Sequence, residues 1–329
     1  SGCGVGDDDG GQAADADVSS SKKFRWKMVT AWPANFPVFQ EGVEKFAADV
    51  GVMSNGRLDI RVFAGGELVP SLGVFDAVSQ GSVELGHGSA YYWAGKIPAA
   101  QFLSAVPFGL TAQGMNSWID SGGGLQIWRE LYQPFRVVPF PMGNTGMQMG
   151  GWFNKRVDSI EDLKGLKMRI PGLGGKVLAK AGGNPVLYDA SEVYSALERG
   201  VIDATEWVGP LHDVRMGLDR AAKYYYFPGW HQQSTWLDLI INLEKWNGLT
   251  PVQQSQFEMA CGDSVRHSIA RGEAIQVPAL EFLAEQGVQF HLWPKEFLDT
   301  YAAAWEEVVT DEVDRDEDFA RVWASLSGG

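Results

Sequence analysis

The chain has 329 residues, with 27 Lys and Arg against 41 Asp and Glu, which gives a formal net charge of −14 at pH 7. This acidic balance argues against a nucleic-acid partner, because phosphates are bound by surfaces rich in Lys and Arg. The hydrophobic fraction of 45% is typical of a globular chain, and no window approaches the roughly 18 apolar residues that a membrane-spanning helix needs.

Residues 1–21 contain five Asp and no aromatic residue, so we predict a disordered acidic tether there. The start Ser-Gly-Cys-Gly resembles the site of a bacterial lipoprotein, in which Cys3 would carry a lipid after removal of a signal peptide. A plain thiol in a polar tail is the alternative. Cys261 lies in a helical stretch and is typical of a small buried hydrophobe. We therefore expect neither a disulfide nor a zinc cluster.

The first half of the body alternates between strand and helix. Alternating polarity predicts strands at 24–30 and 58–63, and apolar residues at helical spacing predict a helix at 38–50 between them. The elements expected next are a helix at 74–79, a strand at 82–88, a helix at 118–132 and a strand at 137–141.

The second half repeats this alternation. Its expected strands are 150–154, 166–170, 202–207 and 290–292, and its expected helices are 174–181, 191–198 and a long one at 252–283 that bends near Pro278. Ser159 and Asp162 have the spacing of a capping box at a short helical turn. The acidic stretch 306–318 is typical of a solvated amphipathic helix.

These βα units predict an α/β fold with mostly parallel sheets. The two runs, 24–141 and 150–229, indicate two lobes. In open α/β sheets a ligand binds beyond the carboxyl ends of the strands, so we expect the ligand cleft between the lobes.

Five stretches in a fixed order carry a specific pattern. They are AYYW at 90–93, GNTGMQMGGWF at 143–153, LKMRIPG at 166–172, ALERGVIDATEW at 196–207 and YYYFPGW at 224–230. Together they resemble the extracytoplasmic solute receptors of tripartite ATP-independent periplasmic (TRAP) transporters, most of all the branch that binds 2-oxo acids or lactate. The resemblance runs from about residue 24 to 310.

The resemblance implies a two-lobed periplasmic binding-protein fold of type II-like form. Lobe I would comprise 24–148 and about 231–270, and lobe II 149–230 and about 271–329, with the long helix spanning both. The resemblance further implies a periplasmic receptor, not an enzyme, that captures a small organic acid such as pyruvate or lactate and passes it to TRAP membrane subunits. Relatives in this branch pair through their C-terminal helices, so the stretch after Tyr301 would form a homodimer.

Arg169 is the residue on which the binding prediction depends. It ends a predicted strand just before Pro171-Gly172, so its side chain is expected to enter the cleft. The planar guanidinium matches a carboxylate with two parallel hydrogen bonds, whereas the alternative is a surface Arg on a turn. Aromatic rings near the cleft mouth would pack against the apolar part of a short acid. The expected substrate-binding set is Arg169, Gln148, Tyr91, Phe108, Trp207 and Asn144.

A bound cation is also implied by the resemblance. In that branch Gln148, Glu206 and the backbone carbonyl of Trp207 would bind a hard cation that bridges to the substrate. The chain departs from the family at Gln232, where a second Glu is common. A site with one charge fewer weakens a divalent ion more than a monovalent one, so we expect Na⁺ rather than Ca²⁺ on the set Gln148, Glu206, Trp207 and Gln232. A Glu206 paired with a buried Arg or Lys, and a site without metal, are the alternatives.

Other classes of protein have weaker support. Ser195 and the five His residues lack the Gly-x-Ser-x-Gly and His-x-x-x-His patterns of common hydrolases. The glycine-rich run at 172–175 precedes a helix, as at a phosphate site, but lacks the P-loop Lys. Two alternative hypotheses stay open. The chain could be a receptor of the same fold for another carboxylate, such as an aromatic or amino acid, or a ligand-sensing domain that signals to a partner protein.

Overall fold

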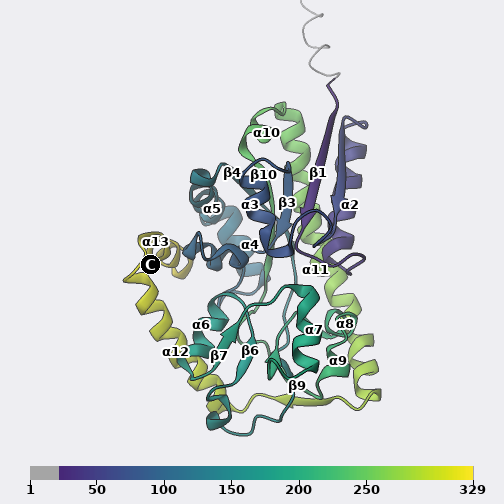
Figure 1. Cartoon of the computed structure of the whole chain (residues 1–329). Coiled ribbons are helices and arrows are strands. Elements are labelled where there is room, and N and C mark those ends of the chain that lie inside the picture. The colour runs from purple at the N-terminus through teal and green to yellow at the C-terminus, as the bar shows by residue number, and fades with distance from the viewer. Residues whose placement is uncertain (1–21, 329) are drawn as a thin grey trace, which may run out of the picture.

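The computed structural model describes residues 22–328, so the predicted tether and Cys3 lie outside the described residues. Two mixed sheets, each with helices around it, form an upper and a lower unit in Figure 1. The strand order is β2-β1-β3-β10-β4 in the first sheet and β11-β9-β5-β8-β6-β7 in the second. Within the described residues, no helix combines the length and the apolar composition needed to cross a membrane.

The first unit contains the amino-terminal strands. Its sheet consists of β1 (Phe24–Thr30), β2 (Leu58–Phe63), β3 (Leu85–Gly88), β4 (Val137–Asn144) and β10 (Trp236–Asn242). Its helices are α2 (Phe39–Met53), α3 (Val74–Ser79), α4 (Ala112–Ser121), α5 (Gly124–Tyr132) and α10 (Leu243–Asn247). Short 3₁₀ turns complete it: η2 (Ser71–Gly73), η3 (Ala90–Trp93), η4 (Pro98–Leu103) and η5 (Gln133–Phe135).

The second unit is built around shorter strands. They are β5 (Gly151–Phe153), β6 (Lys167–Arg169), β7 (Asn184–Val186), β8 (Ala204–Thr205), β9 (Tyr224–Phe227) and β11 (Gln289–Leu292). Its helical elements are η6 (Ile160–Leu163), α6 (Gly172–Lys180), α7 (Ala190–Glu198), α8 (Pro210–Arg215) and α9 (Leu218–Ala221). The predicted capping box is confirmed, since Asp162 accepts hydrogen bonds from the backbone and hydroxyl of Ser159.

The expectation of mostly parallel sheets holds within the βα units but not at two strands. Strand β5 is antiparallel to both of its neighbours, and so is β10. Each is the first strand after the chain has crossed from one unit to the other. A strand that enters its sheet from the crossing side runs away from the cleft, whereas β3, β6 and β8 run toward it. The sheets are therefore mixed.

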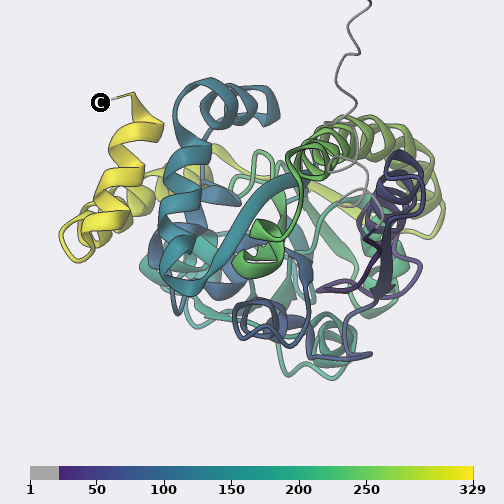
Figure 2. The same cartoon turned by 90° about the horizontal axis from the view of Figure 1, so that it is seen from above.

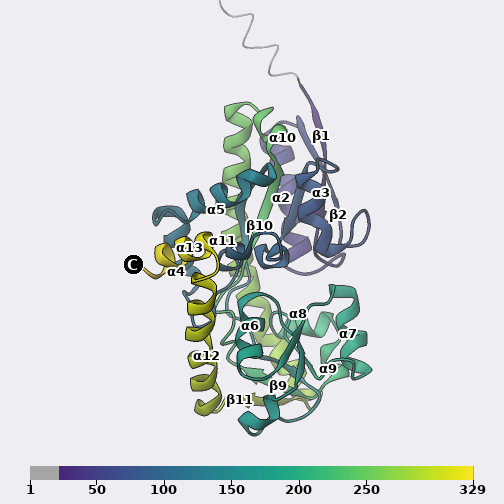
Figure 3. The same ribbon diagram turned by 60° about the vertical axis from the view of Figure 1, so that its left-hand side comes forward.

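Three C-terminal helices connect the two units. They are α11 (Pro251–Glu285), α12 (Lys295–Val313) and α13 (Glu317–Ser327). Helix α11, with Pro278 inside it, packs against α2 and β4 of the first unit and α8 of the second. Figure 3 shows α12 along the second unit and α13 beside the first. Helix α13 packs on η4 and α5 of the first unit and, seen from above, lies next to that unit (Figure 2), whereas the sequence analysis expected the residues after about 271 in lobe II.

Two other expectations differ from the fold. The helix expected at 118–132 is two helices, since Gly123 between them has φ +87° and cannot continue a helix. The sequence analysis also placed no strand at β10. All seven of its residues are buried, so the period-two signal of a half-exposed strand is missing.

Candidate ligand cleft

Arg169 and Glu206 meet because two parallel neighbours end at the same edge of the second sheet. Arg169 is the last residue of β6, Glu206 follows β8, and Arg169 pairs with Thr205 in the strand register. The Arg169 guanidinium forms an ion pair with the Glu206 carboxylate, and Nη1 also donates to the Glu206 carbonyl oxygen at 3.2 Å. Both side chains are nearly inaccessible, at 2% and 1% exposure. The alternative of a surface Arg on a turn is wrong.

The Arg169 guanidinium has further neighbours that keep it charged. Its Cζ lies 4.6 Å from the centre of the Trp207 ring, which is a cation–π contact. Burial acts to lower the pKa of Arg169, but the charge of Glu206 and the hydroxyls of Tyr92 and Tyr91 outweigh it and raise that pKa. Its Nε has no hydrogen-bond partner among residues 22–328. A buried, permanent cation therefore retains a donor for a further acceptor.

Glu206 is shared between two partners. One carboxylate oxygen pairs with Arg169, and Oε2 lies 3.2 Å from His231 Nε2. The sequence analysis had assigned Arg169 to a substrate and Glu206 to a cation, with an Arg partner for Glu206 as the alternative. That ion pair is present in the structure.

A second polar group is organised around Gln148, which precedes β5. Its Nε2 donates to the hydroxyls of Thr145 (3.0 Å) and Thr235 (2.9 Å), and Thr235 Oγ1 donates to Gln232 Oε1 at 2.5 Å. The Gln148 Oε1 atom is buried and finds no hydrogen-bond partner in the described part of the chain. An unpaired buried carbonyl oxygen costs about 1–3 kcal/mol, so this atom is available to a donor or a cation.

A small cavity, largely filled by the side chains around it, lies between the two units. Burial raises the pKa of Tyr91 and of Tyr92, which keeps both hydroxyls protonated at neutral pH. The lining residues, mostly apolar, are Trp32, Phe39, Tyr91, Tyr92, Thr145, Gln148, Trp207, Val208, Thr235 and Leu237.

The expected substrate residues are only partly brought together. Tyr91, Gln148 and Trp207 line the cavity, and Arg169 lies against Trp207. Phe108 does not line it: the residue has φ +53°, is 37% exposed and stacks on Trp230. Asn144 is fully buried outside the lining, where Oδ1 accepts the Gly146 amide at 2.8 Å. In this structure Phe108 thus lies outside the cavity lining, and Asn144 makes a turn-capping contact.

Sequence reasoning missed three of the lining aromatics, which are Trp32, Phe39 and Tyr92. Trp32 Nε1 donates to His87 Nδ1 at 2.7 Å, and His87 Nε2 lies 3.1 Å from the Met142 carbonyl. Burial lowers the pKa of His87 to about 4, so its neutral ring fixes Trp32 at neutral pH. The signal was weak, because a Trp before a Pro also marks an ordinary turn.

The residues expected to hold a cation fit a hard ion. They would offer it oxygen atoms, including Gln148 Oε1, which has no partner among the described residues, and Glu206 is the carboxylate among them. Residues 22–328 bring together no group of three or more His, Cys, Asp or Glu that could hold a metal ion. Such an oxygen set suits Na⁺ or Ca²⁺ and not zinc.

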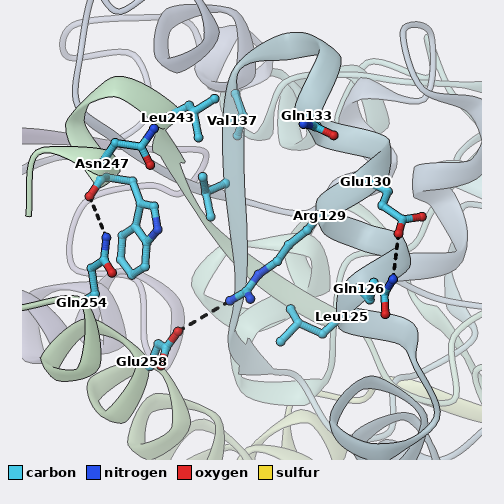
Figure 4. A pocket seen from close by; sticks show the side chains of 12 residues that line it. Leu125, Gln126, Arg129, Glu130, Gln133, Val137, Leu243, Asn247, Gln254 and Glu258 are labelled. Atoms are coloured by element: carbon cyan, nitrogen blue, oxygen red, sulfur yellow. Dashed lines mark hydrogen bonds and ion pairs between the residues drawn. The ribbon is translucent and has the colours of Figure 1, made fainter. Parts of the chain in front are cut away.

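A more open groove lies on the first unit, away from the cleft. Arg129 of α5 points into it, toward Glu258 of α11 (Figure 4), and its Nη2 lies 3.7 Å from the Glu258 carboxylate. Trp246 is also one of the lining residues. None of the expected site residues lines this groove. The candidate ligand site is therefore the buried cavity between the units.

Residues 28–316 match the family described as DctP, bacterial extracellular solute-binding protein, family 7. A monocarboxylate 2-oxoacid-binding periplasmic protein of Nostoc is 43% identical over 299 residues, which is 91% of this chain and 82% of that protein. A TRAP transporter solute-binding protein of Bordetella bronchiseptica, with copurified calcium and picolinate in its active site, has TM-score 0.92 and 39% identity, covering 94% of this chain and 92% of its own. One from Pseudoalteromonas atlantica, with sodium and pyruvate, has TM-score 0.91 and 37% identity, covering 93% and 94%.

Proposed function

The chain belongs to family 7 of the bacterial extracellular solute-binding proteins and is a TRAP solute receptor rather than an enzyme, and on this premise we propose that it captures a small 2-oxo monocarboxylate such as pyruvate. The Nostoc relative is named for such acids, and the Pseudoalteromonas structure holds pyruvate. The observation that carries the proposal is the buried Arg169, whose Nε has no hydrogen-bond partner among the described residues and whose guanidinium lies against Trp207, a residue that lines the small cavity.

The charges around the cavity favour one carboxylate over two. The Arg169 guanidinium lies against the Trp207 ring, and none of the described residues that line the cavity is Lys or Arg. A second carboxylate would have to be buried against Trp32, Phe39 or Leu237, and an unpaired buried charge is strongly unfavourable. A short monocarboxylate places its charge near Arg169 and its apolar end against these side chains.

We further propose that the bound cation is Na⁺. Arg169 and Glu206 cancel each other, so a bound monocarboxylate leaves one uncompensated negative charge. A monovalent cation on Gln148 Oε1, Glu206, the Trp207 carbonyl and Gln232 would restore neutrality, whereas a divalent cation would leave an excess positive charge. Buried sites of zero net charge are the cheapest to desolvate. The relatives hold either sodium or calcium, which supports a cation without selecting one.

Binding would involve both units and close them around the acid. The lining residues come from both units, so a bound molecule contacts both and favours the closed arrangement. We propose that the closed receptor works in the periplasm and delivers the acid to TRAP membrane subunits, with a lipid on Cys3 as its anchor. A homodimer through the C-terminal helices would have to use their outer faces, because Phe319 and Val322 of α13 are fully buried.

A thermal-shift screen tests the proposed ligand class. Pyruvate, lactate, longer 2-oxo acids, picolinate and succinate are added in turn, and a ligand that binds only the folded protein raises the melting temperature. Pyruvate or another 2-oxo acid is expected to give the largest rise. A rise with picolinate alone would favour an aromatic acid, as in the Bordetella relative. A rise with succinate and none with any monocarboxylate would refute the proposal.

A further inference from the structure

One hydrogen bond crosses between the two units outside the ligand cavity. His212 of α8, in the second unit, lies with Nε2 3.2 Å from the carbonyl oxygen of Pro37, in the segment before α2 of the first unit. Both residues are buried, and the Phe36 and Phe39 rings lie 5.4 and 5.1 Å from the imidazole. In Figure 1, α8 belongs to the lower unit and α2 to the upper one.

The His212 side of this contact is fixed within the second unit. The adjacent Asp213 accepts hydrogen bonds from Trp152 Nε1 at 2.9 Å and Tyr225 Oη at 2.6 Å, two side chains from β5 and β9. Gln276 of α11 accepts the Leu211 amide at 3.1 Å. His212 therefore moves with the second sheet whenever the units separate.

The Pro37 side is an unusual turn. Val38 has φ +65° and ψ −47°, and the Phe39 amide donates to the Pro37 carbonyl at 2.7 Å, which closes a three-residue γ-turn. A β-branched residue at positive φ is sterically costly, and such conformations cluster at ligand clamps and switch regions. The turn presents the Pro37 carbonyl to His212 at the edge of the first unit.

This contact is connected to the ligand cavity. The Phe36 ring lies 6.4 Å, edge-on, from the Trp207 ring, which lines the cavity and covers Arg169. Phe39 of the same segment lines the cavity directly. Opening the cleft would thus separate His212 from Pro37 and uncover Trp207 in the same motion.

We propose that His212 and the turn at 36–39 form a latch, a positioning device that holds the cleft closed and so raises the affinity for the ligand. The latch rests on the proposed receptor function but makes no contact with the ligand itself. Burial lowers the pKa of His212 to about 4, so the ring is neutral at neutral pH and donates through Nε2. Because the Pro37 carbonyl keeps its bond to Phe39 when the cleft opens, both states are satisfied and the latch is reversible.

The test compares three variants with the wild-type protein. His212→Leu removes the donor, His212→Gln supplies an amide N–H in its place, and Arg215→Gln changes an exposed residue of the same helix. Pyruvate affinity is measured by calorimetry, the ligand-free melting temperature by calorimetric scanning, and the ligand-free radius of gyration by small-angle scattering. His212→Leu is expected to weaken binding about two- to tenfold, the range of one net hydrogen bond, and to enlarge the ligand-free protein. His212→Gln and Arg215→Gln are expected to match the wild type.

The outcomes separate the latch from the receptor function. If the wild-type protein does not bind pyruvate, the ligand assignment fails, and scattering of the ligand-free variants still decides the latch. Equal scattering and equal affinity for wild type and His212→Leu would overturn the latch. It would also be overturned if His212→Leu and His212→Gln lost affinity and melting temperature alike, because the imidazole would then serve only the packing of α8.

Discussion

Replacing Arg169 by Lys keeps the positive charge and removes the planar fork. A Lys ammonium cannot form two parallel hydrogen bonds to a carboxylate. It also lacks the planar group with which Arg169 stacks on the Trp207 ring. The structure leaves no room for solvent to compensate, since the Arg169 side chain is 2% exposed and pairs with a buried Glu206. The change therefore acts on a desolvated interaction, where geometry matters most.

The expected loss can be worked from this burial. Removing one partner of a desolvated charge pair costs about 2–5 kcal/mol. Because Lys retains the charge, we expect the lower part of that range, about 2–3 kcal/mol, which corresponds to a Kd for pyruvate raised about 30- to 150-fold. Isothermal titration calorimetry measures the Kd, and the ligand-free melting curve checks that the variant is folded.

Arg129→Lys is the matched control for this experiment. Arg129 also pairs with a Glu, but in the groove on the first unit, away from the cavity. Its substitution is expected to leave the pyruvate affinity unchanged. A folded Arg169→Lys protein that binds pyruvate within about threefold of wild type would refute the role assigned to the guanidinium.

Further predictions concern the cation and the buried acids. Replacing Na⁺ by K⁺ is expected to weaken pyruvate binding in calorimetry, whereas EDTA is expected to have no effect; the reverse pattern would indicate a divalent ion. Gln232→Glu adds a carboxylate beside the Gln148 network, so Ca²⁺ is expected to raise its melting temperature more than that of wild type, and equal shifts would contradict the charge argument. Burial raises the pKa of Asp238 from 3.8 to about 8. The folded state then keeps a proton that the unfolded state releases, so stability is lost as the pH rises from about 4 to 8, and the difference between Asp238→Asn and wild type in urea midpoints is expected to grow over that range. Parallel midpoints would place the titration elsewhere.

The chain itself contained the local signals. The alternation at 24–30 and 58–63, the helical spacing at 38–50 and the capping residues Ser159 and Asp162 each act over a few residues, and the structure has β1, β2, α2 and η6 there. The strand end at Arg169, before Pro171-Gly172, was located by the same means, because a strand end at a turn is a local feature, whereas the ligand-binding role of this residue was predicted from the family resemblance.

The tertiary structure decided what depends on contacts between distant segments. Glu206 became the partner of Arg169 because β6 and β8 are neighbours in the sheet, which no local pattern indicates. Strand β10 carries no alternation, since the first sheet buries both of its faces. Burial, sheet order and the choice of partner are properties of the packed chain, because each depends on side chains that meet only after folding.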